Sequence, residues 1–331
     1  MESLLIVKQQ LARFYTRFEA FIVPVLKFLA MLIALLMIGS SVGFMSKLKN
    51  PAIVLIIALL CSFLPTNVIV LMAGLVIVAH MYALSLECCV VVLFVFIIMY
   101  ALYFRFTPGD AIAVLLTPVA FVFHIPYVMP LAMGFTGNPI SCISVGCGTA
   151  VYYILHYVSE HQDALSNGSS MSDLDVESML GGFKTVIDGI LKNDEMVAMI
   201  VTFAATIIVV YLIRKLRINY SWQIALGVGM IVCFVVLLVS SAVLDAEIGI
   251  GGAMVSLLVS AVIVLILQFF IFNVDYSRAE YVQFEDDEYY YYVKAIPKIT
   301  LEAPAVKVRR SNVRRNDMDF DDEDEDDEDD Y

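Results

Sequence analysis

The chain has 331 residues, of which 61% are hydrophobic and 16% are charged, whereas soluble domains average about 45–50% apolar and about 25% charged residues. This composition excludes an ordinary soluble protein and predicts an integral membrane protein. The formal net charge of −13 belongs to the C-terminal tail, because twelve acidic residues lie between Asp317 and Asp330.

Residues 1–23 are predicted to form an amphipathic helix that lies in the membrane interface. Apolar side chains recur there at helical spacing, with basic side chains opposite them: Leu4, Val7, Leu11 and Phe18 against Arg13 and Arg17. No short apolar core with a small-x-small cleavage site is present, so we expect this helix to be retained in the mature protein.

Nine apolar segments follow the predicted interfacial helix. They cover residues 24–45, 51–64, 66–84, 88–104, 111–134, 140–158, 196–213, 222–244 and 250–273. A crossing needs about 17–25 residues, so we interpret 51–64 as a re-entrant half-helix and the other segments as spans. The fold class is therefore an all-α polytopic membrane protein of about eight transmembrane helices, with an N-terminal bundle at 24–158 and a three-helix unit at 196–273.

Basic residues in short loops predict the orientation of the spans. The loop "RKLRIN" at 214–219 is strongly basic and is therefore predicted to be cytoplasmic. Alternation then places both termini in the cytoplasm, residues 159–195 outside, and the protein in the plasma membrane. Lys47 and Lys49 fall on the outer side, against the rule.

The external loop at 159–195 is predicted to contain an amphipathic helix. Ser172 and Asp175 form a capping-box-like pair, and apolar residues then repeat at i, i+3, i+4 and i+7 as far as Leu191. Gly181 and Gly182 weaken this helix by about 1 kcal/mol each relative to alanine.

Proline interrupts two regions of the membrane domain. Pro118, Pro126 and Pro130 lie in one apolar run, and Pro65 lies beside Asn67 in another. Each proline removes a backbone donor and disfavours helix at the preceding residue. Many secondary transporters build their binding sites from such interrupted helices, so these breaks favour a transport function.

Ionisable residues at membrane depth are costly and often functional. The candidates are His80, Glu87, Arg105, Asp110 and His124. Glu87 and Arg105 also suit the ends of spans, and Asp110 also suits the third helical position after a Thr107 cap and Pro108. The predicted polar path comprises the interruptions and the two histidines: Pro65, Asn67, His80, His124 and Asn138.

Asn50-Pro51 and Asn138-Pro139 have the pattern of helix starts. The sequence contains none of the metalloprotease, nucleophile-elbow or phosphate-loop motifs, so nothing supports an enzymatic activity. The six cysteines lie in apolar runs without metal-site spacing and are interpreted as packing residues. No cofactor or metal is predicted.

Residues 274–300 are predicted to form a cytoplasmic β-hairpin, because aromatic and β-branched runs flank "EDDE" and end at Pro297. Residues 301–331 are predicted to be disordered, first basic and then acidic. The acidic run and the basic cluster are interpreted as an electrostatic latch, whose cations are Lys307, Arg309, Arg310, Arg314 and Arg315. The adjacent negative charge disfavours nucleic acid as a partner.

The stretch "YVQFEDDEYYYYVKAIPK" after a terminal span resembles multi-pass membrane proteins of Gram-positive anaerobic bacteria. The resemblance covers this hairpin and the layout of the spans, and it implies a bacterial plasma membrane but no activity and no site residues.

Two functions are compatible with these features. The first is a transporter or permease-type component for an unidentified solute, with its path near the interrupted helices. The alternative is a membrane scaffold or assembly protein that recruits partners through the hairpin and charged tail. The predicted partners are the lipid bilayer, a protein docked on the hairpin, and a second copy of the chain.

Overall fold

The chain is a multi-pass, predominantly helical membrane protein. The computed structural model describes residues 2–167, 183–184, 186–190, 192–216, 218–244, 246, 249–271, 280–285 and 289–295. Within these residues, seven helices are long and apolar enough to cross a bilayer. The large apolar side chains exposed along the helices therefore belong in lipid.

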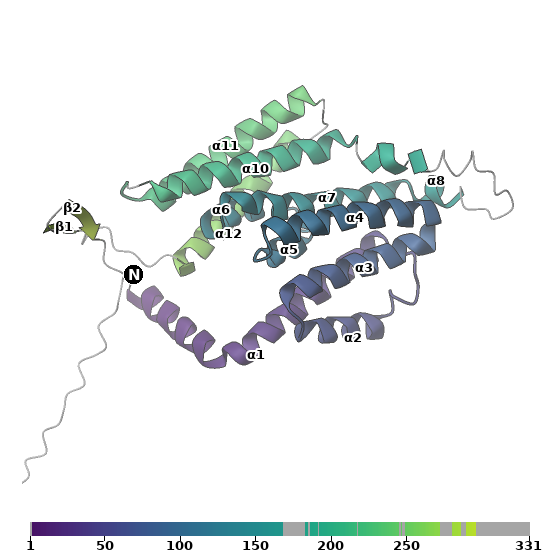
Figure 1. The fold of residues 1–331 in the computed structure, drawn as a ribbon, viewed down its shortest axis with the longest axis horizontal. Coiled ribbons are helices and arrows are strands. Elements are labelled where there is room, and N and C mark those ends of the chain that lie inside the picture. Colours follow the sequence, from purple (N-terminus) through teal and green to yellow (C-terminus); the bar gives the residue numbers. More distant parts are fainter. Residues whose placement is uncertain are drawn as a thin grey trace, which may run out of the picture.

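From α1 to α8 the helices follow one another with short connections (Figure 1). The N-terminal half contains α1 (Glu2–Ser41), α2 (Pro51–Ser62), α3 (Thr66–Leu84) and α4 (Leu86–Phe106). The middle contains α5 (Ala111–Val122), α6 (Val128–Thr136), η1 (Pro139–Ser141), α7 (Cys142–Glu160) and α8 (Gln162–Asn167). The C-terminal part contains α10 (Asp194–Lys215), α11 (Ser221–Val243), α12 (Ile250–Ile271), β1 (Glu280–Glu285) and β2 (Tyr290–Ala295).

Helix α1 joins two segments that the sequence predicts as separate elements. The predicted interfacial helix and the first span form one helix, which bends where Phe18 leaves helical geometry at φ −114° and ψ 17°. Pro24 lies inside the second part. Because no glycine or turn sequence separates the two parts, the helix continues, and its break falls at residue 18 rather than at residue 23.

Specific contacts define two ends of the bundle. At the end called proximal here, the ammonium of Lys8 in α1 donates to the carbonyl of Phe269 in α12 and lies 5.0 Å from its ring centroid. At the distal end, the amide of Met45 donates to Nδ1 of His80, 3.2 Å away. The first and last helices therefore begin and finish at the same end, and α8 lies at the other (Figure 1).

Helices α5 and α6 do not form the continuous span predicted for residues 111–134. Helix α5 rises from the proximal end until Phe121 stacks on Tyr152 at 4.4 Å, and the chain then turns at residues 123–127. Helix α6 runs back to the proximal end, where the carbonyl of Gly137 accepts a hydrogen bond from Arg214 Nη2 at 3.2 Å. The pair is a helical hairpin whose two outer ends lie at the proximal end of the bundle.

The proline positions explain why only one break forms in this run. Pro126 lies in the turn between the helices, so its lack of an N–H deprives no helical carbonyl of a hydrogen-bond donor. Pro118 is accommodated inside α5, and Pro130 falls in the first turn of α6, where a backbone donor has no intrahelical acceptor. His124 takes a left-handed conformation at φ 59°, which ends α5 and reverses the chain.

Helix α2 covers most of the segment that the sequence predicts as a re-entrant half-helix. It leads from the distal loop to Pro65, and near its end Ser62 Oγ donates to the carbonyl of Pro24 in α1 at 3.0 Å. Its 12 residues are about 18 Å long at 1.5 Å per residue. Like α5, it is shorter than the helices that are long enough to cross a bilayer. The loop at 107–110 lies at the proximal end, because Thr107 Oγ1 is 2.6 Å from Ser144 Oγ in the first turn of α7.

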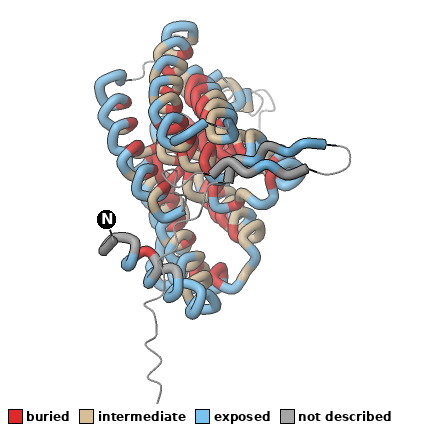
Figure 2. Tube along the Cα trace, turned by 90° about the vertical axis from the view of Figure 1, so that its left-hand side faces the viewer, coloured by how far each residue is buried: buried red, intermediate tan, exposed pale blue. Residues whose placement is uncertain are grey.

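Buried residues form two large apolar clusters and one small one along the inside of the bundle (Figure 2). The first large cluster lies among α1–α4 and the second among α6, α10, α11 and α12, and both α5 and α7 contribute to each. The small cluster joins Tyr103 of α4 to α5 and α7. In the second cluster, Val210 of α10 lies between Gly134 of α6 and Gly229 of α11. The absence of side chains at both glycines allows the three helices to approach closely.

The C-terminal strands pair antiparallel, with Glu280 opposite Ala295 and Glu285 opposite Tyr290. The side chains of Tyr289, Tyr290 and Tyr291 are exposed. Most of the predicted external helix, including Ser172, Asp175 and the two glycines, lies outside the described residues. Its described part, 183–184 and 186–190, is helical and buries Val186 and Ile190 against the bundle.

Candidate functional site

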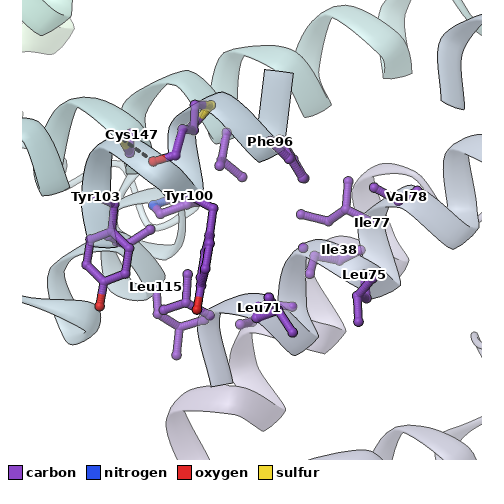
Figure 3. Close-up of a pocket in the computed structure, with 18 of the residues that line it drawn as sticks. Ile38, Leu71, Leu75, Ile77, Val78, Phe96, Tyr100, Tyr103, Leu115 and Cys147 are labelled. Atoms are coloured by element: carbon purple, nitrogen blue, oxygen red, sulfur yellow. Dashed lines mark hydrogen bonds between the residues drawn. The ribbon is translucent and has the colours of Figure 1, made fainter. Parts of the chain in front are cut away.

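A groove of about 360 Å³ lies between α1, α3, α4, α5 and α7. Its lining is almost wholly apolar (Figure 3), with Ile38 from α1, Leu71 and Ile77 from α3, Phe96 from α4 and Leu115 from α5. Ligand sites in proteins typically have volumes of about 300–1,000 Å³. The groove therefore has room for a small ligand or for part of a long one.

The groove opens sideways, between α3 and α4. Leu71 and Leu75 of α3 are 40% and 51% exposed, and Ile97 of α4 is 58% exposed, although all three line the groove. Opposite them, the wall is closed by buried residues such as Ala34 and Val114. Since outward-facing apolar residues of a membrane protein meet lipid, the opening faces the bilayer.

Hydroxyl and amide groups gather at the proximal end of the groove. The phenol of Tyr103, which lines the groove, donates to Oδ1 of Asn67 and lies 3.2 Å from the carbonyl of Pro108. Tyr100 also lines this end, and its ring lies 6.1 Å from that of Tyr103 (Figure 3). Behind Tyr103, Thr107 Oγ1 and Ser144 Oγ are 2.6 Å apart. The groove is therefore apolar along its length and polar at one end.

Lys27 adds a cation at the same end. Its Nζ donates to the carbonyl of Leu64 at 3.1 Å. That carbonyl precedes Pro65 and lies just beyond the C-terminus of α2, where the helix dipole favours a positive charge. Lys27 is not among the site residues predicted from the sequence, although a lysine three residues after Pro24 in an apolar run is a signal for it.

His80 lies at the distal end. Its side chain is buried, and Nδ1 accepts the amide of Met45, so Nδ1 carries no proton in this arrangement. This bond fixes the loop that joins α1 to α2. His80 thus supports a connection between helices.

His124 and Asn138 lie away from the groove. His124 is exposed at the tip of the α5–α6 hairpin, where Nδ1 is 3.0 Å from the carbonyl of Val122, and its own carbonyl accepts Ser256 Oγ of α12 at 2.7 Å. Asn138 precedes η1, and its amide donates to Ser141 Oγ at 3.0 Å. Both residues hold turns in the chain.

A second cavity, of about 380 Å³, lies between α4 and residues 183–190 and is lined only by apolar side chains. In the part of the chain that the structure describes, neither cavity is lined by any of the five residues of the predicted polar path. Among them, only Asn67 reaches a cavity, through Tyr103. The two cavities therefore do not join these residues into one path.

The remaining ionisable candidates occupy helix ends. Glu87 is buried in the first turn of α4 and accepts the hydroxyl of Ser85, while Arg105 in the last turn is exposed. Asp110 directly precedes α5 and makes no side-chain cap, so its predicted place at the third helical position is wrong. Asn50 does cap α2, because its Oδ1 accepts the amide of Ala52 at 3.0 Å.

Among the described residues, no group of three or more histidine, cysteine or acidic side chains is arranged to hold a metal ion. The five cations of the predicted latch, from Lys307 to Arg315, lie outside the described residues, and the latch stays a prediction. No family model matches the chain, and no curated protein or solved structure is significantly similar to it.

Proposed function

We propose that this protein is a transporter or permease-type membrane component that binds a long-chain amphiphile in the groove between α3 and α4. The observation that carries the proposal is the form of this groove, which is open to the bilayer, apolar along its length and polar at its proximal end. An acyl or isoprenoid chain removes apolar surface from water and gains dispersion contacts in such a groove. A small polar solute would leave its own hydrogen bonds unmade there.

The proposed membrane arrangement has eight crossings, by α1–α4, α7, α10, α11 and α12, with α5–α6 re-entrant. It brings Arg105 to the same side as Arg13, Arg17 and Arg214, and positive charge favours the cytoplasmic side. We therefore assign the proximal end and both termini to the cytoplasm of a plasma membrane. Lys47 and Lys49 stay on the outer side.

The re-entrant hairpin supports translocation over simple binding. Non-helical backbone inside a bilayer must be enclosed by protein or face a water-filled space. Transporters place such interrupted helices beside their substrate sites and move them during transport. Here α5 supplies Val114, Leu115 and Pro118 to the wall of the groove, so a movement of the hairpin would change the volume available to the ligand.

Quenching of tryptophan fluorescence by brominated lipid tests the proposal. Trp222 is the single tryptophan, so Trp222→Phe provides a silent background. In that background, Phe96→Trp reports on the groove. Leu102→Trp is the matched control, because Leu102 lies on the same helix, is 45% exposed and lines neither of the two cavities.

A selective site predicts that the reporter at residue 96 is half-quenched at a lower mole fraction of brominated lipid than the reporter at residue 102. Identical dependence at the two positions would mean that the groove is filled by bulk lipid without selection, and the proposal would fail.

The alternative function, a membrane scaffold, is favoured by a different observation. The three helices around Val210 are packed through Gly134 and Gly229, and such a rigid unit suits a platform for partners. The two exposed strands with their tyrosines offer an edge for a partner sheet. A scaffold predicts stable co-purification of a partner that is lost when residues 274–331 are deleted, with no selective quenching at residue 96.

A further inference from the structure

We propose that the groove is specific for an anionic phospholipid, whose phosphate binds Lys27 and the amide of Asn67 while one acyl chain lies along the groove. This inference rests on the proposed function and adds the class of ligand. It combines three observations: the direction of the groove, the position of one cation and the orientation of one amide.

The first observation is that Lys27 lies on the face of α1 that lines the groove. Residues 27, 31, 34 and 38 recur at helical spacing on one side of α1, and Ala34 and Ile38 of this set line the groove. Met31 between them is fully buried. A helical side chain leans towards the N-terminus of its helix, so the Lys27 ammonium lies beyond the proximal end of the apolar lining.

The second observation concerns the bonding of Lys27. An ammonium group has three donors, and within the described residues Lys27 uses one, to the carbonyl of Leu64 at 3.1 Å. The described part of the chain contains two salt bridges, His156–Glu160 and Lys192–Asp188, and Lys27 takes part in neither. Partial burial of a cation without a carboxylate partner is costly. An anion from outside the chain that accepts the two remaining hydrogen bonds of the ammonium would offset this cost.

The third observation is the orientation of Asn67. Because Oδ1 accepts the phenol of Tyr103, the amide nitrogen is turned away from Tyr103 and has no hydrogen-bond partner among the described residues. Asn67 is three residues beyond Leu64, the partner of Lys27. The cation and the two amide protons therefore lie at the same corner, one turn before the lining residue Leu71.

The lipid composition of the cytoplasmic leaflet favours an anionic ligand at this corner, whose surrounding charges are balanced. Asp110 lies on this side, two residues beyond the Pro108 carbonyl, and Arg105 lies on the preceding turn, so neither sign dominates outside the corner. The proximal end carries the basic loop and the basic part of α1, and anionic lipids concentrate in the cytoplasmic leaflet. A phospholipid whose phosphate lies at this corner would direct its acyl chain towards mid-bilayer, which is the direction of the long axis of the groove.

The test uses the full chain with Trp222→Phe and Phe96→Trp in phosphatidylcholine vesicles. Brominated phosphatidylglycerol and brominated phosphatidylcholine are compared at equal mole fractions. One lysine near the membrane surface favours an anionic lipid by about fivefold, converted from about 1 kcal/mol. We therefore expect half-quenching at an about fivefold lower fraction of the anionic lipid. In the Lys27→Met and Asn67→Leu variants, both lipids should reach half-quenching at the same mole fraction. In the Lys27→Arg variant, the anionic lipid should still reach half-quenching at a lower mole fraction than phosphatidylcholine.

Controls separate this inference from the proposed function. Arg17→Met removes an exposed cation from the interfacial part of α1 and should leave the preference unchanged. If residue 96 is quenched more readily than residue 102, but equally by both lipids and without effect of Lys27→Met, the anionic site is wrong and the amphiphile site stands. If the two reporters behave alike, the proposed function itself fails.

The source of the anion is tested in the same vesicles. Excess inorganic phosphate should not restore the fluorescence, because a free ion has no chain to occupy the groove. Restoration by phosphate would identify an ion site and overturn the phospholipid assignment.

Discussion

Replacement of Gly229 by alanine should destabilise the C-terminal half of the membrane domain through one steric clash. A Cβ at this position would lie well inside van der Waals contact with Cγ2 of Val210 and 3.2 Å from Cδ2 of Leu131. Val210 is fully buried, and on its other side Gly134 would place a Cβ only 2.7 Å away. Because valine has one strongly preferred rotamer in a helix, Val210 cannot turn away from the new methyl group.

The magnitude follows from the cost of overpacking, which is typically about 1–3 kcal/mol in a well-packed core. Gly227→Ala is the matched control, since its Cβ would meet nothing within 4 Å and it lies two residues away on the same helix. Both substitutions change helix propensity by a similar amount, about 1 kcal/mol in favour of alanine in water. The difference between the two variants therefore isolates the clash, and we expect Gly229→Ala to be less stable by about 1–3 kcal/mol.

Titration with sodium dodecyl sulfate, followed by the fluorescence of Trp222, measures this difference. Trp222 is the only tryptophan, and its ring stacks on Phe135 of α6 at 5.4 Å, so it reports on the contact between these helices. Adding Val210→Ala should relieve the clash, and the double variant should be more stable than the sum of the single effects implies. Equal stability of the Gly229→Ala and Gly227→Ala variants would refute this account of the packing.

Three further predictions concern other helices. Gly148→Ala should lower stability more than Gly146→Ala on the same helix, because a Cβ at 148 would lie 2.6 Å from Thr117 Cβ, whereas at 146 the nearest atom is 3.6 Å away; equal unfolding midpoints would contradict the close approach of α5 and α7. Asn50→Ala should reduce stability by about 1 kcal/mol through loss of a helix cap, while an aspartate there should retain most of it, as measured by the same titration. In a background without native cysteines, Gly109→Cys should react with an impermeant thiol reagent only after the cells are opened, and His161→Cys in intact cells; labelling of residue 109 in intact cells would show that residues 111–134 cross the membrane.

The sequence predicts the class of fold because the length of an apolar run and its backbone hydrogen bonds are local properties. The long helices, the Asn50 cap and a break near Pro126 all follow from residues close together in the chain. Which interrupted segment crosses and which turns back depends on tertiary contacts. The stacking of Phe121 on Tyr152 and the bond from Ser256 to His124 join residues far apart in sequence, so the sequence alone does not predict that residues 111–134 form two antiparallel helices instead of one span.

The groove could not be predicted from the sequence, for a related reason. Polarity at membrane depth draws attention to His80 and His124, yet these residues support a loop and a turn through bonds to the backbone. The groove is formed by common apolar residues such as Leu71 and Phe96, whose types carry no functional signal. Lys27 becomes informative only when its partner Leu64 and the neighbouring Asn67 are seen together at the end of the groove.

The most direct test of the amphiphile site is native mass spectrometry of the protein purified in mild detergent. The wild-type chain should retain one bound lipid, and this mass should be lost in Leu75→Trp, which fills the mouth of the groove. Leu59→Trp on α2, at a residue that is 57% exposed and not among those lining the groove, should retain it. A wild-type protein without bound lipid, or equal retention in Leu75→Trp and Leu59→Trp, would contradict a ligand site between α3 and α4.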